Sequence, residues 1–186
     1  MIIETERLIF RAWTMDDIEF LVDGLNDYDV AKNLTVPFPY TISDAVDFVS
    51  KHLENNPSSY YFGVVRKDDG KLIGGTNVSI NDIGEYHGGI WLHRDYQGSG
   101  YGTEVWTARA KFAFDIMGAD TLINGYFHFN VRSKRMQLKV GGEIVGEKLN
   151  YCPALQSDVK EIVTKLTREN FDRYYSNIEF KFSVEK

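Results

Sequence analysis

Cysteine is almost absent from this chain, because Cys152 is the only one among 186 residues. No disulfide can therefore form within the chain, which is typical of proteins from a reducing compartment. Long apolar runs are also lacking, since no stretch approaches the roughly 20 residues that cross a bilayer. Residues 1–7 combine two glutamates with a short apolar run, which does not fit a signal peptide. These absences predict a cytoplasmic protein that does not associate with membranes.

An excess of positive charge is missing as well. The chain has 21 Lys and Arg against 27 Asp and Glu, and its net charge of −6 argues against nonspecific nucleic-acid binding. The four histidines and Cys152 stand at no metal-ligand spacing, so no metal site is predicted. Hydrophobic residues make up 43% of the chain, close to the globular average, and we find no repeat or linker. The length then predicts a single domain over residues 1–186.

Changes of hydrophobic period along the chain indicate a mixed α/β architecture. We expect strands at 7–13, 60–66, 71–80, 88–93, 121–127, 143–151 and 159–166. We expect helices at 14–26, 43–54, 101–117, 131–140 and 167–177, the first capped by Thr14 and the second by Ser43. Asp69 and Gly70 supply the tight turn of a hairpin between the second and third strands.

The most informative stretch is Gln-Gly-Ser-Gly-Tyr-Gly at residues 97–102, between an expected strand and an expected helix. Its three glycines leave the backbone bare where the helix begins, and the amides there have no intrahelical partner. With the helix dipole, such a loop forms a site for a pyrophosphate. A dinucleotide fold is disfavoured because the third glycine comes one position early, and no Gly-Lys-Ser/Thr follows for a Walker loop. A merely flexible turn is the remaining alternative.

The segment 90–104 resembles the acetyl-CoA loop of the GNAT N-acetyltransferases, and its Tyr-Gln-Gly-x-Gly-Tyr-x-Thr-Glu stretch is similar to the RimJ/RimL-type branch. Asn-Val-Arg-Ser at 130–133, Lys-Val-Gly at 139–141, and the segments 5–8 and 167–171 match other parts of that branch. Two positions depart from it, since Gly142 stands where phenylalanine is expected and Gly102 where alanine is common. The resemblance implies the GNAT fold, a mixed and mostly antiparallel sheet of about seven strands flanked by helices.

The resemblance also implies an activity, the transfer of an acetyl group from acetyl-CoA to a primary amine by direct attack in a ternary complex. The acceptor could be a protein N-terminus or a small molecule such as a polyamine, an amino acid or an aminoglycoside. A non-catalytic acyl-CoA-binding module is an alternative from a different class. A monomer and a homodimer are both open.

The resemblance assigns the cofactor-binding residues Trp91, Leu92, Gln97, Gly98, Ser99, Gly100, Tyr101, Gly102 and Asn130. Many GNAT enzymes place an acidic tyrosine seven residues after the asparagine, where this chain has Gln137. Ser133, where the branch has a serine, is therefore our candidate acid for the departing thiolate, although a capping hydroxyl is an equal alternative. Glu104, in the first turn of its helix, better fits a structural role at the helix dipole.

The base that accepts the amine proton is less defined. Glu85 precedes the central strand and is the catalytic candidate, with a solvated loop carboxylate as the alternative. His93 and His128 end neighbouring strands, and the intrinsic pKa of a histidine side chain suits a base, but a structural role suits each better. Tyr40 lies in an expected substrate loop and is a candidate substrate contact.

Overall fold

The fold is built from a ten-stranded sheet and six α-helices, and the computed structural model describes residues 1–53, 56–175 and 178–183. The strands are β1 (Ile2–Glu4), β2 (Leu8–Arg11), β3 (Ser59–Arg66), β4 (Leu72–Ile80), β5 (Tyr86–His87), β6 (Ile90–Leu92), β7 (Thr121–Phe127), β8 (Glu143–Cys152), β9 (Ser157–Thr167) and β10 (Lys181–Ser183). The helices are α1 (Ile18–Leu25), α2 (Tyr28–Ala31), α3 (Ile42–His52), α4 (Tyr101–Asp115), α5 (Val131–Lys139) and α6 (Arg168–Tyr175), with short 3₁₀ turns at Met15–Asp17, Arg94–Tyr96 and Pro153–Leu155.

The sheet is mixed and mostly antiparallel, as the sequence predicts. Its order is β10-β1-β2-β3-β4-β5-β7-β9-β8, with β6 paired to β4 beside this path. Among the described strands only β5 and β7 pair in parallel. The expectation of about seven strands is too low. The additional strands are β1 and β10, which pair at one edge, and β5, which lies just before the expected strand 88–93, whereas β6 lies within that expected range.

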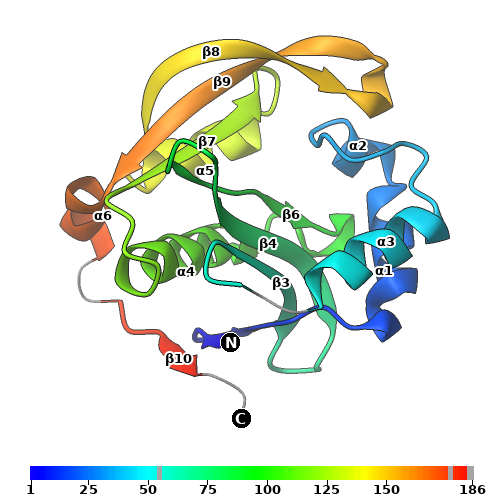
Figure 1. Ribbon diagram of the computed structural model, residues 1–186, viewed down its shortest axis with the longest axis horizontal. Coiled ribbons are helices and arrows are strands. Elements are labelled where there is room, and N and C mark those ends of the chain that lie inside the picture. The colour runs from blue at the N-terminus through cyan, green and yellow to red at the C-terminus, as the bar shows by residue number, and fades with distance from the viewer. Residues whose placement is uncertain (54–55, 176–177, 184–186) are drawn as a thin grey trace.

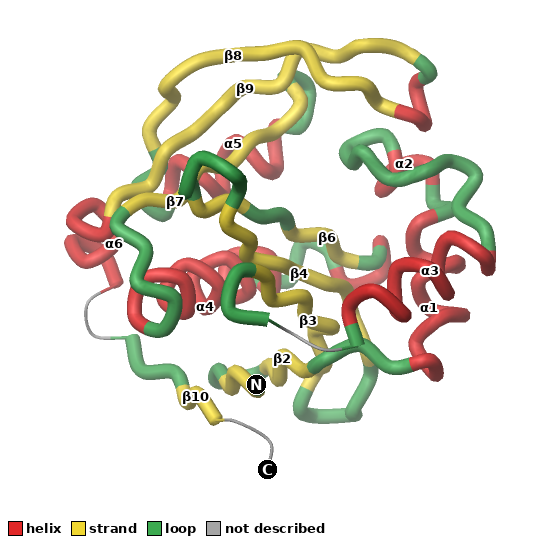
Figure 2. The backbone as a smooth tube through the Cα atoms, in the orientation of Figure 1, coloured by secondary structure: helices red, strands yellow, loops and turns green. Residues whose placement is uncertain are grey.

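The two faces of the sheet carry two separate apolar cores. Successive residues of a strand point to opposite faces, and β3 follows this rule: Phe62 and Val64 join the core under α4, whereas Tyr61 packs into the second core. The first core includes Trp106, Phe112 and Phe114 of α4. The second forms where α1 and α3 cover the other face. Figure 2 shows these helices on either side of the strands.

The helix starts depart from expectation where a better cap precedes the expected one. Helix α3 is capped by Thr41 and not by Ser43, because the Thr41 hydroxyl accepts a hydrogen bond from the Asp44 amide at 3.2 Å while the Asp44 carboxylate accepts one from the Thr41 amide at 2.8 Å. The segment before it contains the unexpected α2, capped by Asp27. The expected helix ends at Glu54 and Asn177 lie outside the described residues.

Strands β8 and β9 form a long hairpin that arches across the molecule from α6 toward α2 (Figure 1). At its far end the Cys152 thiol donates a hydrogen bond to the Lys32 carbonyl oxygen at 3.5 Å. This contact joins the hairpin to the loop that follows α2. The hairpin therefore connects strand β7, with which β9 pairs, to the segment around α2.

Candidate active site

The site begins where two neighbouring strands separate. The last ladder pair between β5 and β7 is His87 with Ile123, and beyond it β6 pairs with β4 alone. The separation occurs at Gly88, where an added Cβ would lie 1.9 Å from the Asn77 carbonyl oxygen. No larger residue fits this close approach of the backbones. The strands therefore separate after this pair, at a break that the sequence pattern had not shown.

A cavity of about 940 Å³ follows this split through the sheet. At one end it is lined by the glycine loop and α5, and at the other by residues of α1, α2 and the following loop. Of the residues that the sequence singles out, it brings together Tyr40, Trp91, Leu92, Gln97, Gly98, Gly100, Gly102, Asn130 and Ser133. The cavity thus connects the candidate cofactor site on one face with the second apolar core on the other.

The glycine loop has the backbone conformation that a cradle for phosphate requires. Gly98 and Gly100 have φ of 86° and 84°, in the left-handed region that glycine favours, and Gly100 caps α4. Gly102 is different, because a Cβ there would make only ordinary contacts, 3.6 Å from Met136 Sδ. Alanine at this position, common in the resembling branch, would therefore fit.

Arg7 holds the loop from outside the cavity. Its guanidinium donates to the Ser99 carbonyl oxygen at 3.2 Å, lies 4.5 Å from the centre of the Tyr101 ring, and pairs with Glu104 at 2.6 Å. Glu104 also accepts a hydrogen bond from the Thr5 hydroxyl at 2.6 Å. The structural role expected of Glu104 is therefore confirmed, but as an anchor of the first strands and not only as a charge at a helix end. Ser99 and Tyr101 make these outer contacts and are not among the described cavity-lining residues.

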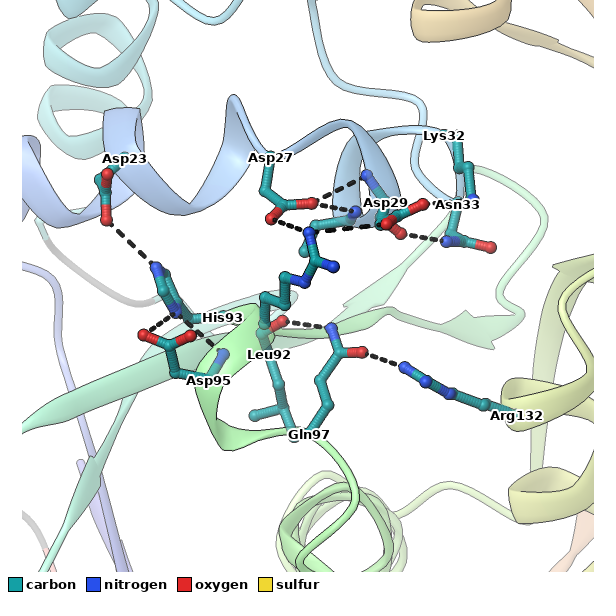
Figure 3. A network of polar contacts seen from close by, with 12 residues as sticks. Asp23, Asp27, Asp29, Lys32, Asn33, Leu92, His93, Asp95, Gln97 and Arg132 are labelled. Atoms are coloured by element: carbon teal, nitrogen blue, oxygen red, sulfur yellow. Dashed lines mark hydrogen bonds and ion pairs between the residues drawn. The ribbon is translucent and has the colours of Figure 1, made fainter.

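Gln97 links the glycine loop to β6 and to α5 (Figure 3). Its side-chain amide donates to the Leu92 carbonyl oxygen at 2.9 Å, at the end of β6, and its oxygen accepts from Arg132 of α5 at 2.6 Å.

The face of α5 toward the cavity is cationic. Arg132, Arg135 and Lys139 all line the cavity, although the chain as a whole is acidic. Their spacing of three and four residues places them on one helix face. Sequence reasoning missed these cations, and this spacing was the signal that could have found them.

Asn130 and Ser133 form a hydrogen-bonded unit at the start of α5. The Asn130 side-chain oxygen accepts from the Ser133 amide at 3.0 Å and so caps the helix. The Ser133 hydroxyl oxygen accepts from the Gln137 side chain at 2.9 Å, which leaves the hydroxyl proton available for another acceptor. Gln137 is buried and is also held by Gly125 and Thr164. The residue at the expected tyrosine position therefore orients Ser133.

The opposite end of the cavity is aromatic, with Trp13, Tyr40, Phe48, Tyr61 and Trp91 in its wall. Glycines make room for the two indoles, because a Cβ at position 75 would lie 2.6 Å from Trp13 Cζ2 and one at position 24 would lie 2.8 Å from Trp91 Cζ3. Burial, with a smaller effect of Asp44, raises the pKa of Tyr40 to about 12. Tyr40 is thus a neutral wall residue at neutral pH.

The structure does not bring the expected base candidates to the cavity. Glu85 lies on an exposed loop, where its carboxylate accepts from the Asn81 side chain at 3.2 Å. His93 contacts Asp23 at 3.1 Å outside the cavity, and His128 lines a separate pocket of about 360 Å³. None of the three is among the described residues that line the large cavity.

A carboxylate that sequence reasoning missed does line the cavity. Glu161 on β9 has a side chain that is 16% exposed and accepts from Asn150 at 2.9 Å. A Cβ at Gly125 would lie 1.8 Å from Glu161 Oε1, so the glycine of β7 leaves the space that this carboxylate occupies. No local motif identifies Glu161, because its position depends on the register between β7 and β9.

Two negative findings concern the described residues alone. Within them, none of the helices is long and apolar enough to cross a bilayer. No group of three or more His, Cys, Asp and Glu side chains in the same part of the chain could hold a metal ion.

Comparison with known proteins places this architecture in a family. The sequence model of the acetyltransferase (GNAT) domain matches residues 7–143. A GNAT-family acetyltransferase from Bacillus anthracis is similar in structure, with 24% identity, a TM-score of 0.78, and coverage of 91% of this chain and 99% of that one. The spermidine N-acetyltransferase of Vibrio cholerae, solved with CoA and spermine, has 17% identity and a TM-score of 0.76 over 88% of this chain and 97% of its own. The ribosomal-protein-S5-alanine acetyltransferase of Vibrio fischeri has 19% identity and a TM-score of 0.76 over 92% and 98%.

The chain belongs to the GNAT acetyltransferase family, because the family model covers most of its length. It is an acetyl-CoA-dependent N-acetyltransferase. The structural relatives share its fold and act on different amines, so they do not identify its acceptor.

Proposed function

We propose that this chain transfers the acetyl group of acetyl-CoA directly to a primary amine that enters from the aromatic end of the cavity. The observation that carries the proposal is the single cavity that joins the glycine loop to the aromatic wall through the split between β6 and β7. The bare amides at 98–102 and the cations of α5 fit the phosphates of CoA. The split leaves room for the thioester arm between the strands.

Proton transfer requires an acceptor for the amine proton and a donor for the leaving thiolate. Asn124 of β7 is hydrogen-bonded to Arg109 of α4, so the next residue, Gly125, faces the opposite side of the sheet, where Glu161 lies. We assign Glu161 as the acceptor of the amine proton and Ser133 as the donor to the leaving thiolate. The amine nitrogen attacks the carbonyl carbon, the carbon–sulfur bond breaks, and one proton passes from the amine to the sulfur. The modest acidity of a thiol, with a pKa near 8.5, makes a serine donor sufficient.

A covalent acetyl-enzyme has no support in the cavity. Cys152 is fully buried, donates to the Lys32 carbonyl oxygen, and is not among the described lining residues. A nucleophilic cysteine needs a lowered pKa and access to the thioester. This arrangement supports the proposed direct attack in a ternary complex.

The acceptor end favours an amine with an apolar body. The wall is aromatic, and it also includes Asp29 of α2, which is paired with Lys32 at 2.5 Å, together with Asn33 and Thr35. An apolar or aromatic body packs against the indoles and phenols of this wall. A slender amine, either a small molecule or a flexible peptide N-terminus, therefore suits this end better than a folded surface.

The test is a screen of amines and N-terminal peptides with acetyl-CoA, in which CoA release is measured. We expect turnover with at least one apolar primary amine, and loss of turnover in Glu161→Gln with acetyl-CoA binding retained. The exposed Glu147→Gln, on the neighbouring strand β8, is the matched control and should leave turnover unchanged. Acetyl-CoA binding without turnover of any amine would instead favour the non-catalytic acyl-CoA-binding module.

A further inference from the structure

One buried cation in the cavity wall is not used by the proposed reaction. Arg109 of α4 is 2% exposed and lines the cavity. Its guanidinium donates to the Asn124 side-chain oxygen and lies 5.1 Å from the Trp106 ring. Both partners are neutral. Arg109 Nε is buried and has no hydrogen-bond partner among the described residues.

A buried guanidinium without an anion is costly. Taking a charge out of water is repaid only when an opposite charge and good hydrogen bonds replace the water. Burial alone lowers the pKa of Arg109 to about 9, with no carboxylate in the described residues close enough to oppose it. The side chain still carries its charge at neutral pH. Among the residues that the structure describes, Arg109 therefore has no anionic partner.

The position of Arg109 indicates which end of a ligand it would meet. Gly88 and Asn124 directly follow the last ladder pair of β5 and β7, and a Cβ at Gly88 would lie 2.9 Å from Arg109 Nη1. The guanidinium thus stands at the closed vertex of the split. The glycine loop stands at the open end of the split, after β6, and the four residue-to-residue steps from Gly88 to Leu92 span roughly 13 Å of strand. A ligand whose phosphates bind at the glycine loop and whose arm follows the split therefore has its reacting end nearest the vertex.

We propose that Arg109 binds a carboxylate of a substrate at the closed end of the split. This inference rests on the proposed acyl transfer. A guanidinium binds a carboxylate in a two-pronged geometry, and Arg109 has donors left for it beyond the one that Asn124 occupies. The carboxylate belongs either to the acyl group of a dicarboxylic acyl-CoA or to an amino-acid-like acceptor whose amine reaches the same thioester.

The experiment compares ligands that differ by the carboxylate alone. For the acyl source, calorimetry measures the affinities of succinyl-CoA and butyryl-CoA, which share a four-carbon acyl chain. For the acceptor source, initial rates with acetyl-CoA measure KM for amino acids and for the matching amino-acid amides. Each pair is tested on the wild-type protein, on Arg109→Met and Arg109→Lys, and on the exposed Arg173→Gln as a matched control.

We expect wild-type to prefer the carboxylate ligand of one pair by about tenfold or more, the effect of one charge-assisted contact. Arg109→Met should remove the preference, Arg109→Lys should retain part of it, and Arg173→Gln should keep it. Affinity for butyryl-CoA should change less than twofold in all variants. The pair that shows the preference identifies the source of the carboxylate.

The absence of a preference in both pairs on wild-type protein would overturn the proposal, and this comparison needs no variant to fold. A preference that survives in folded Arg109→Met would also overturn it. Failure of wild-type to bind any acyl-CoA would contradict the proposed function instead, so the two failures are distinguishable.

Discussion

Two glycines of the same loop, Gly100 and Gly102, should respond in opposite ways to an added side chain. Gly100 has φ of 84° and caps α4, so a β-branched residue there is strained by about 1–2 kcal/mol whatever the free space. Gly102 lies inside the first turn of α4, and its nearest neighbours would be 3.6 and 3.7 Å from an added Cβ. Alanine there should stabilise the helix by about 0.5–1 kcal/mol.

We expect the two variants to differ both in Tm and in their affinity for acetyl-CoA. Gly100→Val should lower Tm by about 2–8 °C, because 1 kcal/mol corresponds to about 2–4 °C in a protein of this size. It should also weaken acetyl-CoA binding more than tenfold, or about 1.4 kcal/mol, since the loop amides must move to relieve the strain. Gly102→Ala should raise Tm and leave the affinity within twofold. Calorimetry on folded Gly100→Val that returns the wild-type affinity would refute the phosphate role of the loop.

Further predictions concern the proton-transfer residues, the lone cysteine and the chain as a whole. Ser133→Ala should lower kcat by about 10²-fold with little change in acetyl-CoA affinity. Asn130→Ala should cost about 1 kcal/mol of stability, because it removes the cap of α5, and should weaken acetyl-CoA binding; a thermal melt and calorimetry check both effects. Glu161→Gln should lower kcat by about 10²-fold while Glu85→Gln keeps it near the wild-type value, and the reverse result would restore Glu85 as the base. Cys152→Ala should stay active with intersecting initial-rate lines, whereas parallel lines would refute direct transfer. The chain should unfold in one calorimetric transition as a single domain, since β1 and β10 join its two ends in one sheet.

Local pattern was sufficient for much of the secondary structure. The hairpin of β3 and β4, strand β7 and helices α4 and α5 lie close to their expected ranges, because each combines a clear hydrophobic period with strong turn or cap residues. Ser43 does not cap α3, because Thr41 and Asp44, which lie on either side of it, form a reciprocal pair of hydrogen bonds. Strands β1 and β10 were missed, since three-residue strands carry too little periodicity and form only by pairing across the fold, β1 with β2 and β10, and β10 with β1.

The sequence by itself determined the glycine-loop end of the cavity. Glycines that need left-handed φ, a following helix and an Asn-x-x-Ser cap all act within a few residues, so their chemistry can be read along the chain. Tertiary structure alone decided the rest of the site. Glu161 reaches the cavity through a strand register, and Arg109 meets the split because α4 crosses beneath it. The sequence does not show whether water or a cavity surrounds a carboxylate or a guanidinium, because the packing of the whole fold decides that environment.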